Sequence, residues 1–342
     1  MLSGLALRLT LAGALLAGAA SLAAAQDAAS FYKSHSLTIG VPNAAGGGYD
    51  VYVRALARFL PKHIPGTPNI IVQNVPAAGG MVLANQLYVT APKDGSYIGM
   101  VRGTVMEEEL HKDPQVHFQS RKFEWLANMN KDVDTCVVSP KSGIKSVEDF
   151  YKTEVSVGAS GVGAQSYSFP IAYQKILGMK MKVIAGYEGT PDRMLAMERG
   201  ELGGACGVSV STFFSQVKPL ADAGKVIVIA QAGLEKDKRF PDLPNILDQA
   251  KTQEARQMLQ LLFTPLALGR PLAAPPGTPA DRVAVLRKAV MDTLKDPEFL
   301  AEAKRIKIDI QPMDATETAK ATDAMLSAPP AIADKLKQLI GG

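Results

Sequence analysis

The stretch SLTIGVPNAAGGGYDVYVRALARFL, residues 36–60, places three consecutive glycines between a short apolar run and an amphipathic segment. Residues 36–41 predict a β-strand. Residues 49–60 predict a helix, because Val53 and Leu56 share one face at a spacing of about 3.6 residues. The glycines let the backbone approach a ligand closely, and the first amides of a helix have no internal partner. This turn therefore predicts a site for an anion, and a glycine-rich connection without a ligand is the alternative.

The remainder of the chain alternates between short apolar runs and longer amphipathic stretches. Strands are predicted at residues 69–75, 97–101, 135–139, 154–158, 181–184 and 226–230, and helices at residues 81–89, 192–199, 281–294 and 297–306. This alternation is typical of an α/β protein. The turn PAAGG, residues 76–80, joins the second strand to its helix, so two glycine-bearing turns are expected at one edge of one sheet. The proline-rich residues 271–279 are predicted to form a loop.

Residues 1–25 have the features of a secretory signal peptide. They carry one charge, Arg8, followed by an apolar stretch, and they end in Ala23-Ala24-Ala25, which fits cleavage before Gln26. A membrane anchor is the alternative, but the segment leads into small residues rather than a basic stop. No cysteine lies in this leader, so we expect a soluble protein exported to the periplasm, without a lipid anchor.

Composition limits the class of function. The chain has 342 residues and a net charge of +4, which is enough chain for two domains and too balanced a charge for a nucleic-acid binder. The acidic run Glu107-Glu108-Glu109 is interpreted as a solvated helix face. Two cysteines alone do not make a disulfide framework, so we expect Cys136 and Cys206 to be unpaired, and a disulfide is the alternative.

Motifs for catalysis or metal binding are lacking. The four histidines do not have the spacing of zinc ligands, no P-loop lysine follows the glycines, and no G-x-S-x-G elbow occurs. We therefore expect no catalytic residue, no metal and no cofactor. The strongest enzyme alternative uses Cys206 as a nucleophile, which requires a lowered pKa and a neighbouring base. A buried structural cysteine is the simpler interpretation.

Several motifs, taken in order, carry a family resemblance. They are VPNAAGGGYDVYVRALARFL (41–60), IIVQNVPAAGGMVLAN (70–85), APKDGSYIGM (91–100), VGASGVGAQ (157–165), GYEGTPDRMLAMERGEL (186–202), DAGKVIVIA (222–230), RFPDLPNI (239–246) and LAAPPGTPADRVAVLRKAV (272–290). In this order they resemble the extracytoplasmic solute receptors of tripartite tricarboxylate transporters, the Bug or TctC-like family.

The resemblance implies an α/β, bilobal periplasmic-binding-protein fold of type II, with a hinge and a ligand cleft between two domains. Domain 1 is expected at residues 27–132 and 243–342, and domain 2 at residues 133–242. The implied function is capture of a small organic carboxylate by a monomer and its delivery to integral membrane transporter subunits. A periplasmic sensor for a membrane kinase is the alternative with the same fold.

The resemblance also assigns ligand-binding residues to four turns. They are Asn43, Ala45, Gly46, Gly47, Gly48 and Asp50 in the first turn, Ala77, Ala78 and Gly79 in the second, Ser160, Gly161, Gly163, Ala164 and Gln165 in the third, and Tyr187 and Gly189 in the fourth. Asp50 is more simply explained by a bond within its own loop or an ion pair with Arg54, one helical turn away. The turns contain no lysine or arginine, so backbone amides and helix N-termini are expected to hold the carboxylate.

Overall fold

The structure is a computed structural model that describes residues 28–43, 45–110, 112–161, 164–187 and 189–341. The predicted signal peptide and Gly163 of the third turn lie outside the described residues.

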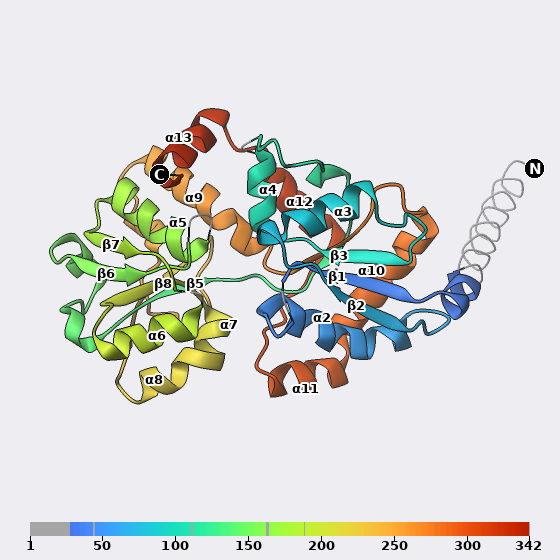
Figure 1. Ribbon diagram of the computed structural model, residues 1–342, viewed down its shortest axis with the longest axis horizontal. Coiled ribbons are helices and arrows are strands. Elements are labelled where there is room, and N and C mark those ends of the chain that lie inside the picture. Colours follow the sequence, from blue (N-terminus) through green and yellow to red (C-terminus); the bar gives the residue numbers. More distant parts are fainter. Residues whose placement is uncertain (1–27, 44, 111, 162–163, 188, 342) are drawn as a thin grey trace, which may run out of the picture.

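The chain forms two lobes, each built around one mixed β-sheet with helices packed on it (Figure 1). The first sheet has the order β11-β4-β10-β3-β1-β2 and the second β7-β6-β8-β5-β9. The strands are β1 (Leu37–Val41), β2 (Ile70–Asn74), β3 (Tyr97–Met100), β4 (Glu124–Asn128), β5 (Asp134–Val138), β6 (Val155–Gly158), β7 (Met181–Ile184), β8 (Gly204–Ser209), β9 (Ile227–Ala232), β10 (Pro271–Ala274) and β11 (Met313–Asp314). The predicted bilobal α/β fold is confirmed.

Parallel strands in both lobes are followed by turns that lead into helices. β1 pairs in parallel with β2 and β3, and β6 pairs in parallel with β7 and β8. The helices are α2 (Gly48–Phe59), α3 (Met81–Val89), α4 (Gly103–Leu110), α5 (Gln165–Ala172), α6 (Thr190–Arg199), α7 (Val210–Thr212), α8 (Lys218–Asp222), α9 (Gln253–Ala267), α10 (Ala280–Lys295), α11 (Pro297–Arg305), α12 (Ala315–Leu326) and α13 (Pro330–Ile340). The turns after β1 and β2 therefore lie at one edge of one sheet, as predicted.

The amphipathic helix that follows the three glycines is α2. Its Val53 and Leu56 are fully buried and belong to one apolar cluster with Leu286 and Val290 of α10. The predicted stripe on residues 281–294 is thus the face of α10 that packs in the first lobe. Burial of such side chains contributes on the order of 2 kcal/mol each, which fixes the helix behind the glycine turn.

The proline-rich stretch at residues 271–279 begins with a strand rather than a loop. β10 runs antiparallel between β3 and β4, and all four of its residues are buried. Pro271 is tolerated because it is the first residue of the strand, and its carbonyl oxygen accepts a 3.0 Å hydrogen bond from the amide of Val101. The prediction of a loop at residues 271–274 is therefore wrong.

The two lobes are connected at several points. The chain crosses from β4 to β5 through residues 129–133, and it returns from β9 to β10 by way of α9. In the predicted first domain, α10 and α12 contact β4, whereas α13 contacts α5 and α9 (Figure 1). The rings of Phe169 in α5 and Phe263 in α9 lie 5.3 Å apart, so α9 joins the core of the second lobe as well. The domain boundaries stay a prediction.

Cys136 of β5 and Cys206 of β8 form a disulfide. The two strands are antiparallel neighbours, and the two Cα atoms lie 4.1 Å apart. The expectation of unpaired thiols is therefore wrong. The sequence did not indicate the bond, because the pairing depends on a strand contact between residues that are 70 positions apart. The bond also engages the sulfur that the enzyme alternative required as a nucleophile.

The acidic run on α4 is not a solvated face. Glu109 accepts a 2.8 Å hydrogen bond from the amide of Ser120, and Glu107 and Glu108 face a cavity that α5, α9 and α13 also line. Burial, with a smaller contribution from Glu108, raises the pKa of Glu107 to about 8. The interpretation of this run as solvated is wrong for Glu107, because α4 packs between the lobes.

We expect Glu107 to make the stability of the protein depend on pH. An acid with a raised folded-state pKa stabilises the fold fully below its unfolded pKa, and this contribution is lost as the pH rises through the folded value. For Glu107 the contribution disappears between about pH 4.5 and about pH 8. Glu107→Gln should therefore stabilise the protein by on the order of 2 kcal/mol at about pH 9 and by little at about pH 5. Urea unfolding at both pH values measures this, and an equal difference at the two would contradict it.

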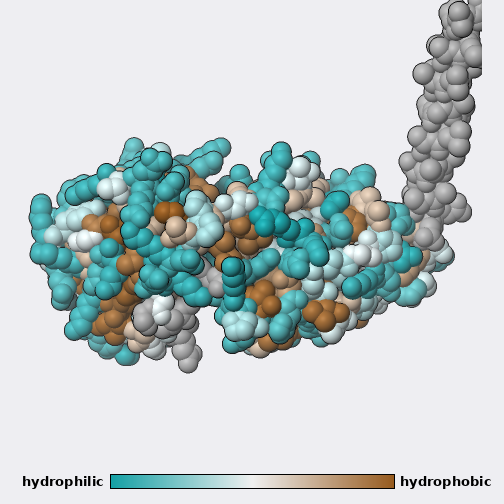
Figure 2. Space-filling view, turned by 90° about the horizontal axis from the view of Figure 1, so that it is seen from above, coloured by the Kyte–Doolittle hydropathy of each residue, from teal (hydrophilic) through white to brown (hydrophobic). Residues whose placement is uncertain are grey.

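Within the described ranges, none of the helices has the length and apolar character needed to cross a membrane. The face in Figure 2 is mainly hydrophilic, with apolar residues in separate patches.

Candidate ligand-binding site

A cavity of about 180 Å³ lies between the two lobes, and residues of both lobes line it. Its lining residues are Tyr49, Arg102, Thr104, Asp132, Asp134, Gln165, Thr190, Gly207, Ser209, Thr212, Pro265, Leu266, Gly269 and Arg270. Pockets for drug-sized ligands usually have about 300–1,000 Å³, so this cavity suits a smaller molecule.

The strand topology explains why these residues meet. Arg102 follows β3, Gln165 and Thr190 begin the helices after β6 and β7, and Ser209 ends β8. Ligands of open α/β sheets bind outside the carboxyl ends of the parallel strands, where the turns into the helices lie. The cavity occupies this position in both lobes at once.

Arg270 is the best-positioned cation in the cavity. Its guanidinium carbon lies 4.4 Å from the ring centre of Tyr49 and 4.8 Å from that of Tyr52. Nη1 lies 3.8 Å from a carboxylate oxygen of Asp132, and the backbone amide of Arg270 donates to Asn128. Nε is buried and has no hydrogen-bond partner among the residues described. Nη1 also donates a 2.6 Å hydrogen bond to the carbonyl oxygen of Gly269. The stacked rings orient the guanidinium at the wall of the cavity, where its positive charge attracts an anion.

Arg102 supplies a second guanidinium, which also lies over the ring of Tyr49. Its guanidinium carbon lies 5.3 Å from the centre of that ring, and its buried Nε likewise lacks a partner in the described part of the chain. The aliphatic stem packs on Gly80, where an added Cβ would lie 2.9 Å from the Arg102 Cδ. Gly80 also has φ 103°, so its lack of a side chain lets the arginine lie against the second turn.

Two aspartates give the cavity negative charge as well. Asp134, at the start of β5, is 1% exposed, and its Oδ2 accepts no hydrogen bond from any described residue. Burial raises its pKa well above the usual range, Asp132 adds to this, and Arg193 and Arg270 oppose it. Burial likewise raises the pKa of Asp132 to about 6, against the attraction of Arg270. The site therefore combines guanidinium groups with carboxyl groups that are costly to ionise.

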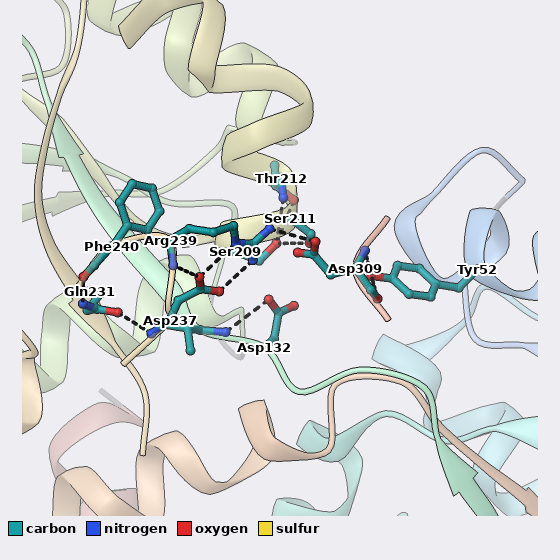
Figure 3. A network of polar contacts seen from close by, with 11 residues as sticks. Tyr52, Asp132, Ser209, Ser211, Thr212, Gln231, Asp237, Arg239, Phe240 and Asp309 are labelled. Carbon is teal, nitrogen blue, oxygen red and sulfur yellow. Dashed lines mark hydrogen bonds and ion pairs between the residues drawn. The ribbon is translucent and has the colours of Figure 1, made fainter. Parts of the chain in front are cut away.

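A polar network connects the lobes at one side of this region (Figure 3). Arg239, after β9, donates a 2.7 Å hydrogen bond to Asp309 of the first lobe and another to Asp237. Asp309 is held in turn by Tyr52, whose hydroxyl donates to its carbonyl oxygen and accepts from its amide. Tyr52 thus contacts both this bridge and Arg270, which couples the interlobe contact to the cavity.

The first predicted turn lies beside the cavity rather than in it. Asp50 accepts hydrogen bonds from the amide of Gly46, from Arg54 and from Asn74, which confirms its role within its own loop. Ala45, Gly46 and Asp50 line a separate open depression next to α2. Gly47 is the N-cap of α2, and the carbonyl oxygen of Asn43 accepts a hydrogen bond from the side-chain amide of Asn74. Gly48 lies next to Arg270, because a Cβ added to Gly48 would be 3.6 Å from Nη2 of the arginine.

The other predicted turns contribute one cavity-lining residue among those described, Gln165. Ala77, Ala78 and Gly79 are exposed. The amide of Ser160 donates to Ser166, Gly161 faces open space, and Ala164 is the N-cap of α5. The amide of Tyr187 donates to Ala159, and Gly189 is the N-cap of α6. Their role as ligand contacts stays a prediction.

The sequence interpretation missed both arginines and both aspartates of the cavity. A signal for Arg102 was present, because the predicted strand at residues 97–101 places the next residue at the edge that carries the first turn. Arg270 precedes β10, which was interpreted as a loop, so no local pattern identified it. Asp132 lies on the crossing between the lobes and Asp134 begins β5 directly after it, and no local pattern marks either residue as part of a cavity.

Comparison with known proteins agrees with this architecture. Residues 53–337 match the model of the tripartite tricarboxylate transporter family receptor, TctC. The chain is 26% identical over 288 residues to the UPF0065 protein in the TAR-I ttuE-ttuC' intergenic region of Agrobacterium vitis, covering 81% of this chain and 75% of that protein.

Solved structures share the fold at low sequence identity. A TctC solute-binding protein from Polaromonas, solved without ligand, has a TM-score of 0.69 and 21% identity, with 89% of this chain and 99% of that chain covered. An R. palustris protein solved with adipate has a TM-score of 0.64 and 17% identity, with 90% of this chain and 98% of that chain covered. With a family match that spans most of its length, this chain belongs to the tripartite tricarboxylate transporter receptor family of periplasmic solute-binding proteins.

Proposed function

We propose that this protein captures a small organic carboxylate between its two lobes and delivers it to the integral membrane subunits of a tripartite transporter. The observation that carries the proposal is the pair of guanidinium groups, Arg102 and Arg270, that both lie over the ring of Tyr49 in the interlobe cavity. Planar guanidinium groups bind carboxylates through charge-assisted, often bidentate hydrogen bonds. The family and the R. palustris structure with adipate support a carboxylate as the ligand class.

We infer that the predicted glycine turns assist these side chains. Gly48 opens α2 next to Arg270, and Gln165 opens α5 at the opposite wall, so both helix N-termini lie near the cavity. Each such terminus favours an anion by about 0.3–1 kcal/mol, and by up to ~2 kcal/mol when partly buried. The turns are therefore proposed to add backbone donors, while the arginines provide the charge.

The ligand is proposed to close the lobes of a monomer around itself. Contacts to Arg270 from one lobe and to Gln165 from the other can be made together only when the lobes are close, so binding favours the closed form. The ion pair between Arg239 and Asp309 supports that form, because it joins the two lobes directly over 2.7 Å.

Export is proposed to precede binding. Residues 1–25 would be removed before Gln26, and the mature protein would act in the periplasm. N-terminal sequencing of exported protein tests this, since a retained leader would contradict it.

A thermal-shift screen of the mature protein with mono- and dicarboxylates of three to six carbons tests the proposed function. A ligand present at about 100 times its dissociation constant stabilises the bound state by about 2.7 kcal/mol. We expect at least one carboxylate to raise the melting temperature in proportion to the logarithm of its concentration. Matched primary alcohols of the same chain length serve as controls and should have no effect. If no carboxylate shifts the transition, the proposal is wrong.

A further inference from the structure

The disulfide lies at an irregularity of the second sheet. The register between the antiparallel strands β5 and β8 shifts between Thr135 and Val137. Cys136 of β5 therefore faces two residues of β8, Cys206 and Gly207, which form a β-bulge. Gly207 has a positive φ of 69°, a conformation that glycine adopts readily. The disulfide thus joins the two strands at the bulge itself.

The bulge forms part of the cavity wall in the second lobe. Gly207 and Ser209 line the cavity, whereas Val208 between them is fully buried. Side chains alternate along a strand, so a slip of β8 by one residue would turn Ser209 away from the cavity and Val208 toward it. The position of the bulge therefore decides which side chains of β8 a ligand meets.

The bulge also sets the position of α5. A Cβ added to Gly207 would lie 2.8 Å from the backbone nitrogen and from the Cα of Ser166, and 2.9 Å from the carbonyl carbon of Gln165. The first turn of α5 is therefore packed on the backbone of the bulge, more closely than a side chain would permit. Gln165 lines the cavity, so a shift of the bulge would move this residue as well.

Arg193 of α6 holds the same bulge through hydrogen bonds. Its Nη1 donates a 2.9 Å hydrogen bond to the carbonyl oxygen of Cys206, and its Nη2 donates a 2.9 Å hydrogen bond to the hydroxyl of Thr190. Arg193 is buried, and Thr190 lines the cavity at the start of α6. The bulge is therefore fixed by a covalent bond to β5 and by a buried guanidinium of α6.

We propose that the disulfide is a positioning element for ligand binding, which together with Arg193 fixes the bulge that presents Gly207, Ser209 and Gln165 to the cavity. A wall that is already ordered spares the ligand the free-energy cost of ordering it, so loss of the bond lowers the affinity as well as the stability. This inference rests on the proposed function, because it requires a ligand in the interlobe cavity.

The affinity then depends on the redox state of the two cysteines. Exchange with an external disulfide, which is itself reduced to two thiols, closes the bond between Cys136 and Cys206 and gives the form with high affinity. Both cysteines are 1% exposed, so the exchange takes place before β5 and β8 pack or when they open. In the dithiol form the bond no longer holds β8 in register with β5.

Calorimetry at about 15 °C, where folded proteins are near their maximum stability, compares the oxidised wild-type protein with the double variant Cys136→Ala, Cys206→Ala. The probe is the carboxylate that gives the largest thermal shift among the monocarboxylates from propionate to hexanoate and the dicarboxylates from malonate to adipate. We expect the double variant to bind it at least about tenfold more weakly. Urea unfolding verifies that each protein is at least about 90% folded, so incomplete folding changes the apparent Kd by less than about twofold.

Ile144→Ala is the matched control for loss of stability. Ile144 is buried beyond the end of β5 that lies away from Asp134, and it is not among the described residues that line the interlobe cavity. Its truncation leaves a cavity in the core of the second lobe and destabilises the protein. We expect the affinity of this variant to stay within about twofold of the wild-type value.

Two further measurements test the positioning role independently. Wild-type protein unfolded in urea and refolded in dithiothreitol is in the dithiol form, because the reductant becomes a cyclic disulfide and leaves two protein thiols. It should bind the probe as weakly as the double variant, and reoxidation should restore the affinity. Arg193→Met keeps the disulfide but removes the hydrogen bond to Cys206, and it should weaken binding at least about fivefold.

The outcomes separate the two proposals. Equal affinity of the oxidised protein and the disulfide-free forms would overturn this inference and leave the proposed function intact, and so would an equal loss of affinity in Ile144→Ala. If the double variant does not fold, Arg193→Met decides, and wild-type affinity in that variant overturns the inference. If the wild-type protein binds none of the carboxylates, the proposed function is refuted, and this inference with it.

Discussion

Replacing Arg270 with glutamine is expected to weaken carboxylate binding by at least about thirtyfold. The guanidinium is held over the rings of Tyr49 and Tyr52, with its buried Nε still unpaired among the described residues. Loss of one partner of a desolvated charge pair costs about 2–5 kcal/mol, which corresponds to a factor of about thirty to several thousand in affinity. Isothermal titration with the tightest carboxylate measures the loss directly.

Arg54→Gln is the matched control for this variant. Arg54 is half-exposed, bonds to Asp50 and does not line the interlobe cavity, so its replacement should change the affinity by less than about twofold. Gly47→Val tests the competing view that backbone amides of the first turn hold the anion. If Gly47→Val abolished binding and Arg270→Gln preserved it, the turn rather than the cavity arginine would carry the affinity.

Loss of the disulfide between Cys136 and Cys206 is expected to destabilise the protein by about 2–4 kcal/mol. The bond closes a loop of 70 residues, and a long closed loop restricts the unfolded chain strongly. It also joins β5, which begins with Asp134, to β8, which carries the cavity residues Gly207 and Ser209. The double variant Cys136→Ala, Cys206→Ala should therefore unfold at a lower urea concentration than the wild-type protein.

Dithiothreitol provides an independent test of the same bond. We expect the reductant to lower the urea midpoint of the wild-type protein toward that of the double variant, and to leave the double variant unchanged. Equal midpoints for the oxidised wild-type protein and the double variant would contradict a stabilising disulfide.

Local sequence patterns were sufficient to predict much of the fold. Helix α3 at residues 81–89 and strand β7 at residues 181–184 have the predicted bounds, because their apolar spacing and flanking turns lie within one segment. Features that depend on distant contacts were not predicted. The strand β10 and the disulfide each require neighbours far along the chain, and proline or a lone cysteine carries no information about them.

The candidate site shows the same division. The glycine turns were visible because backbone conformation leaves a local signature, as the positive φ values of Gly46, Gly79 and Gly80 illustrate. The charges of the cavity were not visible. Arg102, Arg270 and Asp134 come from three separate segments, and their burial results from the packing of one lobe against the other. Among the residues that directly follow the predicted strands, Arg102 alone is charged.

A crystal structure of the mature protein with its tightest carboxylate tests the central claim most directly. The account predicts one ligand in the interlobe cavity, with its carboxylate within hydrogen-bonding distance of the guanidinium groups of Arg102 and Arg270. Density for the ligand on the outer surface, at the depression beside α2 or elsewhere outside this cavity, would contradict capture between the lobes.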